Sequence, residues 1–318
     1  MPESRSIRPV ERILYLKKLD MLANLPSLEL TALAQNTRER TFQKGEVLLH
    51  EDEPVGAIHL IVDGAVNASR HGTFLGRFGP GTALGGLAIL ARDSHGLHAV
   101  AETGTFVLTL ERDALLEVCE DHFAVVQGML HHVCRSFIEL QSRIWPALGA
   151  VVRPGTETYV AQGEMDFVER ILLLRSIAPF ARASINALSE LSRNITEVRF
   201  GAGVQLWRQD DASGYLLLMV AGTVLCSRRD HSEGIQFGRG MSIGAAEAMA
   251  EAPRWYDAVT ETPVVALHAS IEPLIDVFED NFEMAMDYLG FLAQLQLLGI
   301  DREAAQRSAA AAGSVAAP

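Results

Sequence analysis

The feature that most constrains this chain is an internal repeat. A segment reading Val-Glu-Arg-Ile-Leu begins at Val10 and returns at Val168, and the same offset of 158 residues holds without a gap to Val66 and Val224. Other residues paired at this offset are Phe42 and Phe200, Gly45 and Gly203, Asp52 and Asp210, Gly56 and Gly214, and Gly64 and Gly222. Chance does not align such a series, so the chain holds two copies of one folding unit.

The second part of the repeat continues after one inserted residue. At an offset of 159 residues, Gly81 pairs with Gly240, Gly85 pairs with Gly244, and residues 120–123 pair with residues 279–282. Glycine adopts backbone conformations that other residues avoid, so matched glycines predict the same turns in the same order. We expect a first domain over 1–145, a linker over 146–165, a second domain over 166–300 and a disordered Ala-rich tail over 301–318.

Each copy is expected to be mainly β with flanking helices. A helical lead-in over 10–25 and a helix over 28–35 precede short strands separated by glycine-rich turns. Helices over 113–119 and from 123 toward 140 follow them, and in the second copy the final helix spans 281–298. Expected strands in the first copy are residues 46–49, 57–62, 65–69, 74–78, 99–101 and 105–110. Many short strands predict a β-roll, a double-stranded jelly roll, in each copy.

The expected order is a helix, a β-roll and a helix, with a glycine turn before a short central helix. This order resembles the cyclic-nucleotide-binding domain. That family includes the catabolite activator proteins and the regulatory subunits of protein kinase A. The resemblance covers about residues 10–140 and 168–298 and rests on the turns around Gly45, Gly64, Gly203 and Gly222 and on residues 81–90 and 240–249. It implies that a helix N-terminus and an arginine bind a cyclic phosphate, while a glutamate binds the ribose hydroxyl.

The second copy carries this ligand-binding segment in part. Gly244, Ala245 and Ala246 stand at the expected helix start, and Ala245 replaces the family's glutamate. Arg254 stands at the position of the family's arginine, and Trp255 follows it. The resemblance therefore implies a cation without its acidic partner. The aromatic pair at 255–256 either stacks on a purine or fills the pocket, and we favour filling. A register shift that lets Glu247 replace the missing carboxylate stays open.

The first copy departs further from the family. Gly85, Gly86 and Leu87 form its expected helix start, with Gly86 at the glutamate position. His95 stands where the family has its arginine. A protonated histidine binds anions, so His95 is kept as a ligand-binding candidate.

Composition excludes several functions. A net charge of −13 argues against nucleic acid and against an anionic membrane surface as partners. No apolar run reaches the roughly 18 residues of a membrane span, and no signal peptide is visible. Three cysteines without a Cys-x-x-Cys pair predict buried thiols in a reducing cytoplasm. Neither a nucleophile motif nor a metal-binding spacing is present, so we expect no enzyme, no metal and no cofactor besides a possible cyclic nucleotide.

Two functions remain. Only about twenty residues follow the last expected helix, which leaves no room for a DNA-reading domain. We therefore expect a non-catalytic regulatory or scaffold protein that acts through contacts with an unknown protein partner. The alternative is a sensor that binds cAMP, cGMP or another small anion in the second copy and moves its final helix. That helix has a broad apolar face, which favours homodimerisation.

Overall fold

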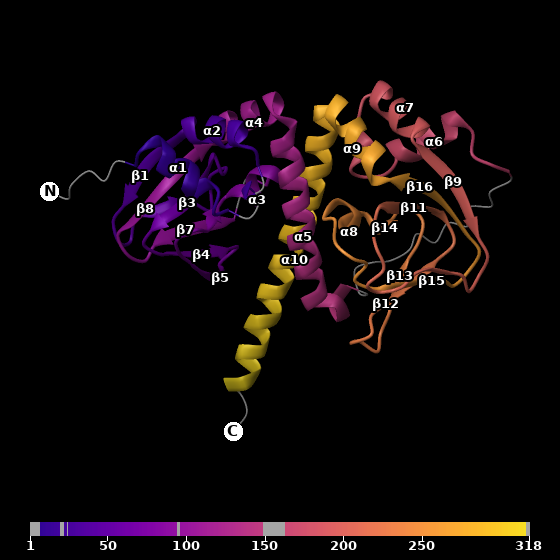
Figure 1. Ribbon diagram of the computed structural model, residues 1–318. Coiled ribbons are helices and arrows are strands. Elements are labelled where there is room, and N and C mark those ends of the chain that lie inside the picture. The colour runs from indigo at the N-terminus through magenta and orange to yellow at the C-terminus, as the bar shows by residue number, and fades with distance from the viewer. Residues whose placement is uncertain (1–6, 20–21, 24, 94–95, 149–162, 316–318) are drawn as a thin grey trace. The chain divides into compact units, whose positions relative to one another are not determined.

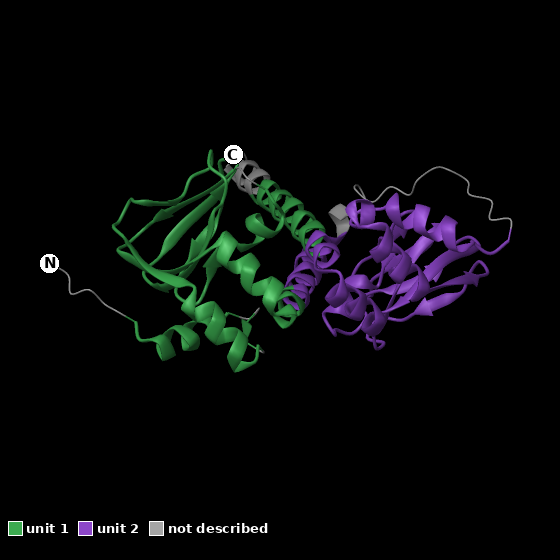
Figure 2. Ribbon diagram, turned by 90° about the horizontal axis from the view of Figure 1, so that it is seen from above, with its two compact units in different colours: residues 1–129, 289–318 green, residues 130–288 purple. Residues whose placement is uncertain are grey.

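The computed structural model describes residues 7–19, 22–23, 25–93, 96–148 and 163–315. The chain forms two compact units, one made of residues 1–129 with 289–318 and the other of residues 130–288, as Figure 2 shows in green and purple. Each unit contains one complete β-roll. The unit boundaries therefore do not coincide with the ends of the sequence repeats.

Unit 1 opens with two short helices, α1 and α2, and continues into eight strands with a third helix between β6 and β7 (Figure 1). Helix α4 and the start of α5 follow the last strand. The bounds are α1 Pro9–Leu16, α2 Ser27–Gln35, β1 Thr37–Phe42, β2 Val47–Leu49, β3 Ala57–Asp63, β4 Val66–Arg70, β5 Thr73–Phe78, β6 Ala83–Leu84, α3 Gly86–Leu90, β7 Leu97–Ala101, β8 Thr105–Glu111, α4 Arg112–Asp121 and α5 Phe123–Leu148.

The strands of unit 1 pair into two antiparallel four-stranded sheets, in the orders β1-β8-β3-β6 and β2-β7-β4-β5. Side chains of β4 alternate between buried and half-buried positions, the period-two pattern of a strand with one face on a core. Strand β1 was not expected from the sequence. Its four middle residues are polar or charged, and only Thr37 and Phe42 are buried.

Unit 2 repeats this order of elements. The bounds of its elements are α6 Phe167–Arg175, a 3₁₀ turn Phe180–Arg182, α7 Ile185–Arg193, β9 Ile195–Phe200, β10 Gln205–Trp207, β11 Tyr215–Ala221, β12 Val224–Ser227, β13 Ile235–Phe237, β14 Ser242–Ile243, α8 Ala245–Met249, β15 Asp257–Thr260, β16 Val264–Ser270 and α9 Ile271–Asp280. Helix α10, Phe282–Val315, begins in this unit and continues beyond it. The sheets are β9-β16-β11-β14 and β10-β15-β12-β13, the same pairing order as in unit 1. The fold is thus mainly antiparallel β with flanking helices, as predicted.

The lead-in helices are fixed to their sheets by equivalent contacts. Arg12 on α1 donates through Nη1 to the carbonyl oxygen of Thr37 at 2.9 Å. Arg170 on α6 donates in the same way to the carbonyl oxygen of Ile195 at 3.2 Å. Both acceptors are the first residues of their strands, and they lie 158 residues apart. The sequence repeat therefore extends to individual hydrogen bonds.

The two long helices each begin in one unit and end in the other. Helix α5 starts in unit 1, and its residues from 130 onward belong to unit 2. Helix α10 starts in unit 2, and its residues from 289 onward belong to unit 1 (Figure 2). Each β-roll is therefore completed by a helical segment that the other repeat supplies, which the sequence did not predict.

The end of the chain differs from the expectation. Helix α10 continues to Val315, so residues 301–315, expected as a disordered tail, are helical. The cause is that alanine, which dominates this stretch, has the highest intrinsic helix propensity. In the expected linker 146–165, residues 146–148 end helix α5 and residues 149–162 lie outside the described part of the chain.

Candidate functional site

The candidate site in unit 2 begins where strand β14 passes into helix α8. Gly244 joins them in the left-handed region, with φ of 79°. A Cβ atom at this residue would lie 2.2 Å from Nη1 of Arg254 and 3.2 Å from the carbonyl oxygen of Tyr215. The turn therefore requires glycine both for its backbone conformation and for the close approach of the arginine.

Arg254 is the charged group of this site. It is only 1% exposed, and its guanidinium donates through Nη1 to the carbonyl oxygen of Gly244 at 2.9 Å and through Nη2 to that of Tyr215 at 2.7 Å. Its Cζ atom lies 4.2 Å from the ring centroid of Trp207, a cation–π contact. The guanidinium is therefore held by protein groups, although its Nε atom is buried without a partner among the described residues.

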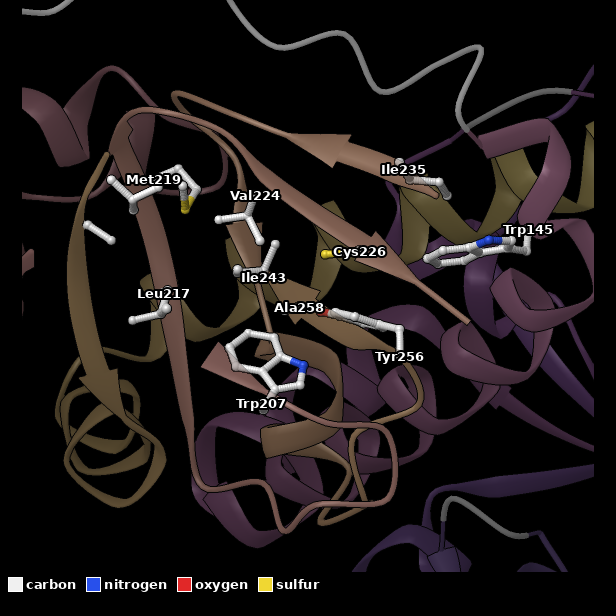
Figure 3. Close-up of a cluster of buried hydrophobic side chains, with 12 residues drawn as sticks. Trp145, Trp207, Leu217, Met219, Val224, Cys226, Ile235, Ile243, Tyr256 and Ala258 are labelled. Carbon is white, nitrogen blue, oxygen red and sulfur yellow. The ribbon is translucent and has the colours of Figure 1, made fainter. Parts of the chain in front are cut away.

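Aromatic side chains occupy the space beside the arginine. The backbone N–H of Gly244 donates to the hydroxyl oxygen of Tyr256 at 3.0 Å. The Tyr256 ring is buried and stacks on Trp145 with centroids 6.1 Å apart, and Trp255 meets Trp145 edge to face at 5.1 Å. Figure 3 shows Trp145, Trp207 and Tyr256 within one apolar cluster. The N–H at the start of α8 thus already has an acceptor from the protein.

The start of helix α8 brings a carboxyl group into the same core. Ala245 is buried, Ala246 is half-buried, and Glu247 is 1% exposed. Burial raises the pKa of Glu247 above its ordinary value, against the opposing effect of hydrogen bonds and of the Arg254 charge. Its Oε1 atom is buried without a hydrogen-bond partner among the described residues. Glu247 therefore lies in the interior of unit 2.

The corresponding segment of unit 1 carries no charged side chain at its start. Gly85 has φ of 94°, and a Cβ there would lie 2.7 Å from the carbonyl oxygen of Ala57. Gly86 and Leu87 are half-buried in the first turn of α3. His95, the remaining candidate of this copy, lies outside the described residues.

A buried arginine in unit 1 was not singled out from the sequence. Arg70, at the end of β4, is 5% exposed and forms ion pairs with Asp93 and, at 2.9 Å, with Asp301 of the α10 segment. Its partner in the repeat is Arg228 in unit 2, which donates to the carbonyl oxygen of Ser142 on the α5 segment at 3.1 Å. The sequence did contain a signal for this residue, because Arg70 and Arg228 each lie six residues after the equivalent glycine turns at Gly64 and Gly222.

Residues 39–122 match the family model of the cyclic nucleotide-binding domain. The match to the cyclic nucleotide-binding domain runs from within β1 to the residue after α4, and it includes Gly85, Gly86 and Leu87. The curated proteins contain no match to this chain.

Several solved structures are similar to the chain. The cAMP complex of the PKA regulatory domain of Toxoplasma gondii is 13% identical, with a TM-score of 0.35, over 90% of this chain and 96% of that chain. The regulatory subunit of a cAMP-independent protein kinase A from Trypanosoma cruzi, bound to guanosine, is 15% identical, with a TM-score of 0.35, over 89% and 87%. A cyclic nucleotide-binding-like protein from Brucella abortus is 23% identical, with a TM-score of 0.31, over 35% and 98%.

Two other features are absent from the described part of the chain. Among the described residues, no group of three or more His, Cys, Asp and Glu side chains is placed to hold a metal ion. Within those residues, every helix is too short or too polar to cross a bilayer.

Proposed function

We propose that this protein is a non-catalytic regulatory or scaffold protein made of two cyclic-nucleotide-binding-like domains, and that it acts through contacts with other proteins. One observation carries the proposal. The groups of the second domain that would bind a cyclic phosphate, the N–H of Gly244 and the guanidinium of Arg254, are bonded to Tyr256, to Gly244 and to Tyr215.

The energy of those contacts works against a nucleotide. Hydrogen bonds from a charged group contribute about 1.5–3 kcal/mol each, and Arg254 makes two of them in a buried environment. A cyclic phosphate would have to replace both bonds and the Tyr256 hydroxyl. No carboxylate stands at residue 245 to bind a ribose in return. The internal contacts therefore favour a domain whose polar groups are satisfied by the protein, without a ligand.

The first domain supports the same proposal. Gly86 stands where a ribose-binding carboxylate would be required. The buried cation of this unit, Arg70, already has Asp93 and Asp301 as counter-ions, so binding an anion there would separate an existing ion pair.

Thermal unfolding with saturating cAMP, cGMP and cyclic dinucleotides tests this proposal. A ligand that binds only the native state at 100 times its Kd stabilises it by about 2.7 kcal/mol and raises the midpoint. We expect no shift with any of them. A shift that Arg254→Lys or Arg254→Ala removes, in variants that still unfold cooperatively, would overturn the proposal.

A nucleotide sensor in the second domain is the alternative. The observation that favours it is the pair of buried, unpartnered atoms, Nε of Arg254 and Oε1 of Glu247. Calorimetric titration of cAMP, with Glu247→Gln as the comparison, separates the two functions because only a sensor gives a saturable heat of binding. Homodimerisation and a cytoplasmic location stay predictions, and light scattering after gel filtration tests the former.

A further inference from the structure

In the repeated segment Val-Glu-Arg-Ile-Leu, the glutamate and the arginine form hydrogen bonds within their own domain. In the first repeat, Glu11 accepts a hydrogen bond from the backbone N–H of Arg8 at 2.9 Å. Glu169 accepts from the N–H of Asp166 at the same distance. Together with the arginine bonds to the first strands described above, these contacts fix the start of α1 and of α6. The glutamate and the arginine are therefore retained in both copies for the fold.

The valine and the leucine of the segment have no such role. Val10 and Leu14 are 68% and 57% exposed, and Val168 and Leu172 are 60% and 62% exposed. Residues four apart lie on the same face of a helix, so each pair forms an apolar stripe on α1 and on α6. A single exposed leucine needs no explanation, but the same stripe on equivalent helices of both copies does.

The charge beside each stripe indicates what covers it. The residue seven positions after the valine is basic and exposed in both copies, Lys17 in the first and Arg175 in the second. It lies almost two helical turns after the valine and so continues the same face, with Lys17 directly after the end of α1 and Arg175 at the last residue of α6. The chain as a whole carries 40 acidic and 27 basic residues, so a basic end to both stripes is contrary to the overall charge. Charge complementarity therefore favours an acidic partner.

The size of the stripe indicates the form of that partner. A stable dimer interface buries about 1,200–2,000 Å² in total, far more than two aliphatic side chains and one basic side chain supply. An amphipathic helix that binds through its apolar face uses anchors at positions such as i, i+4 and i+7, a length that matches each stripe with its basic residue. An amphipathic helix fits these faces better than a second copy of this chain.

We propose that the faces Val10-Leu14-Lys17 and Val168-Leu172-Arg175 are two equivalent docking sites for amphipathic helices of a partner protein, with acidic residues beside apolar anchors. One chain binds two such helices. The inference deepens the proposed function, on which it rests, because it names the surface and the kind of partner through which the protein acts.

Calorimetric titration of the full chain with synthetic helices tests the proposal. The probes are a panel of helical peptides with Leu at i, i+4 and i+7 and Glu on the flanks, and a matched panel with Lys in place of Glu. We expect the acidic peptides to bind at two sites per chain. Leu14→Glu and Leu172→Glu should each remove one site by lowering its affinity at least tenfold, and the double variant should bind none.

Phe74→Glu is the matched control, because Phe74 is 61% exposed but belongs to strand β5 and to neither helix. This variant should keep two sites. Equal binding by the Lys panel, no binding by any acidic peptide, or unchanged binding by the Leu14→Glu and Leu172→Glu variants overturns the proposal. Two further results would also overturn it: a homodimer that these two variants abolish, or binding to phosphatidylglycerol vesicles that they abolish. The nucleotide experiment is independent of the peptide titration. A shift of the thermal midpoint by cAMP would therefore refute the proposed function without changing the result for the peptides.

Discussion

At the scale of single residues, the site in unit 2 differs from a binding pocket whose polar groups are left free for a ligand, because its main polar groups are bonded to the protein. Gly244 allows the Arg254 guanidinium to approach the backbone, and the guanidinium then binds the glycine's own carbonyl oxygen. The sequence predicted that this glycine and this arginine belong to a ligand-binding segment. It could not predict that they bind each other, because the distance between them depends on how β14 and the loop before β15 pack.

Stability as a function of pH follows from Glu247 at this scale. The folded protein binds the Glu247 proton more tightly than the unfolded chain does, because burial raises its pKa. The stability from this group is therefore fully present below the unfolded pKa and is lost as pH rises through the folded value. Glutamine does not ionise, so Glu247→Gln should lose less stability than the wild type as the pH rises above about 4, the ordinary pKa of a glutamate.

Thermal midpoints across this range measure the effect. Glu251→Gln is the control, because Glu251 lies on the same segment but is exposed. Its curve should parallel that of the wild type. Parallel curves for the wild type and Glu247→Gln would show that the buried carboxyl does not titrate with folding.

At the scale of elements, the main finding is that each roll is completed by the helix of the other repeat. In unit 1, Gln294 of α10 donates to the carbonyl oxygen of Ala91 at 2.9 Å, and Asp301 binds Arg70. In unit 2, Trp145 of α5 donates to the carbonyl oxygen of Glu233 at 3.1 Å. Both helical segments therefore form hydrogen bonds with the roll that they complete.

A double-mutant cycle on Arg70 and Asp301 tests the strength of this contact. Asp301→Ala should lower the unfolding free energy by about 1–3 kcal/mol, because it removes a partner of a buried guanidinium. In an Arg70→Met background the same change should cost less than about 0.5 kcal/mol.

Denaturant unfolding supplies these free energies. The exposed pair of Arg77 and Glu102 is the control, since such pairs contribute about 0–1 kcal/mol. Additive effects of Arg70→Met and Asp301→Ala would mean that the ion pair does not hold the helix to the roll.

At the scale of the whole molecule, the repeat was sufficient to predict the two rolls, because matched glycines fix the order of turns. Strand β1 was missed since its middle residues, Arg38 to Thr41, are polar. The exchange of helices was missed for a different reason. Apolar spacing in α10 predicts that residues such as Leu292 are buried, but it does not say which roll buries them. Arg70 was missed because its counter-ion Asp301 lies 231 residues away.

Truncation after Tyr288 tests the exchange for the chain as a whole. It removes the part of α10 that belongs to unit 1 and leaves residues 130–288 intact. Amide hydrogen exchange in α3 and β4 should accelerate at least tenfold, since Arg70 and Ala91 lose their partners, while β12 stays protected. Truncation after Arg307 should change neither, and unchanged exchange in α3 and β4 of the shorter chain would contradict the exchange of helices.

The contact between Arg70 and Asp301 also sets an order of events during synthesis. Domains made early on a ribosome generally fold before later ones emerge. Here the first roll cannot gain its last ion pair until residue 301 has left the exit tunnel, long after β4 was translated. The nascent first unit therefore lacks its α10 segment while the entire second repeat is being made, and the surface that this segment covers in the finished protein is open to aggregation for that interval.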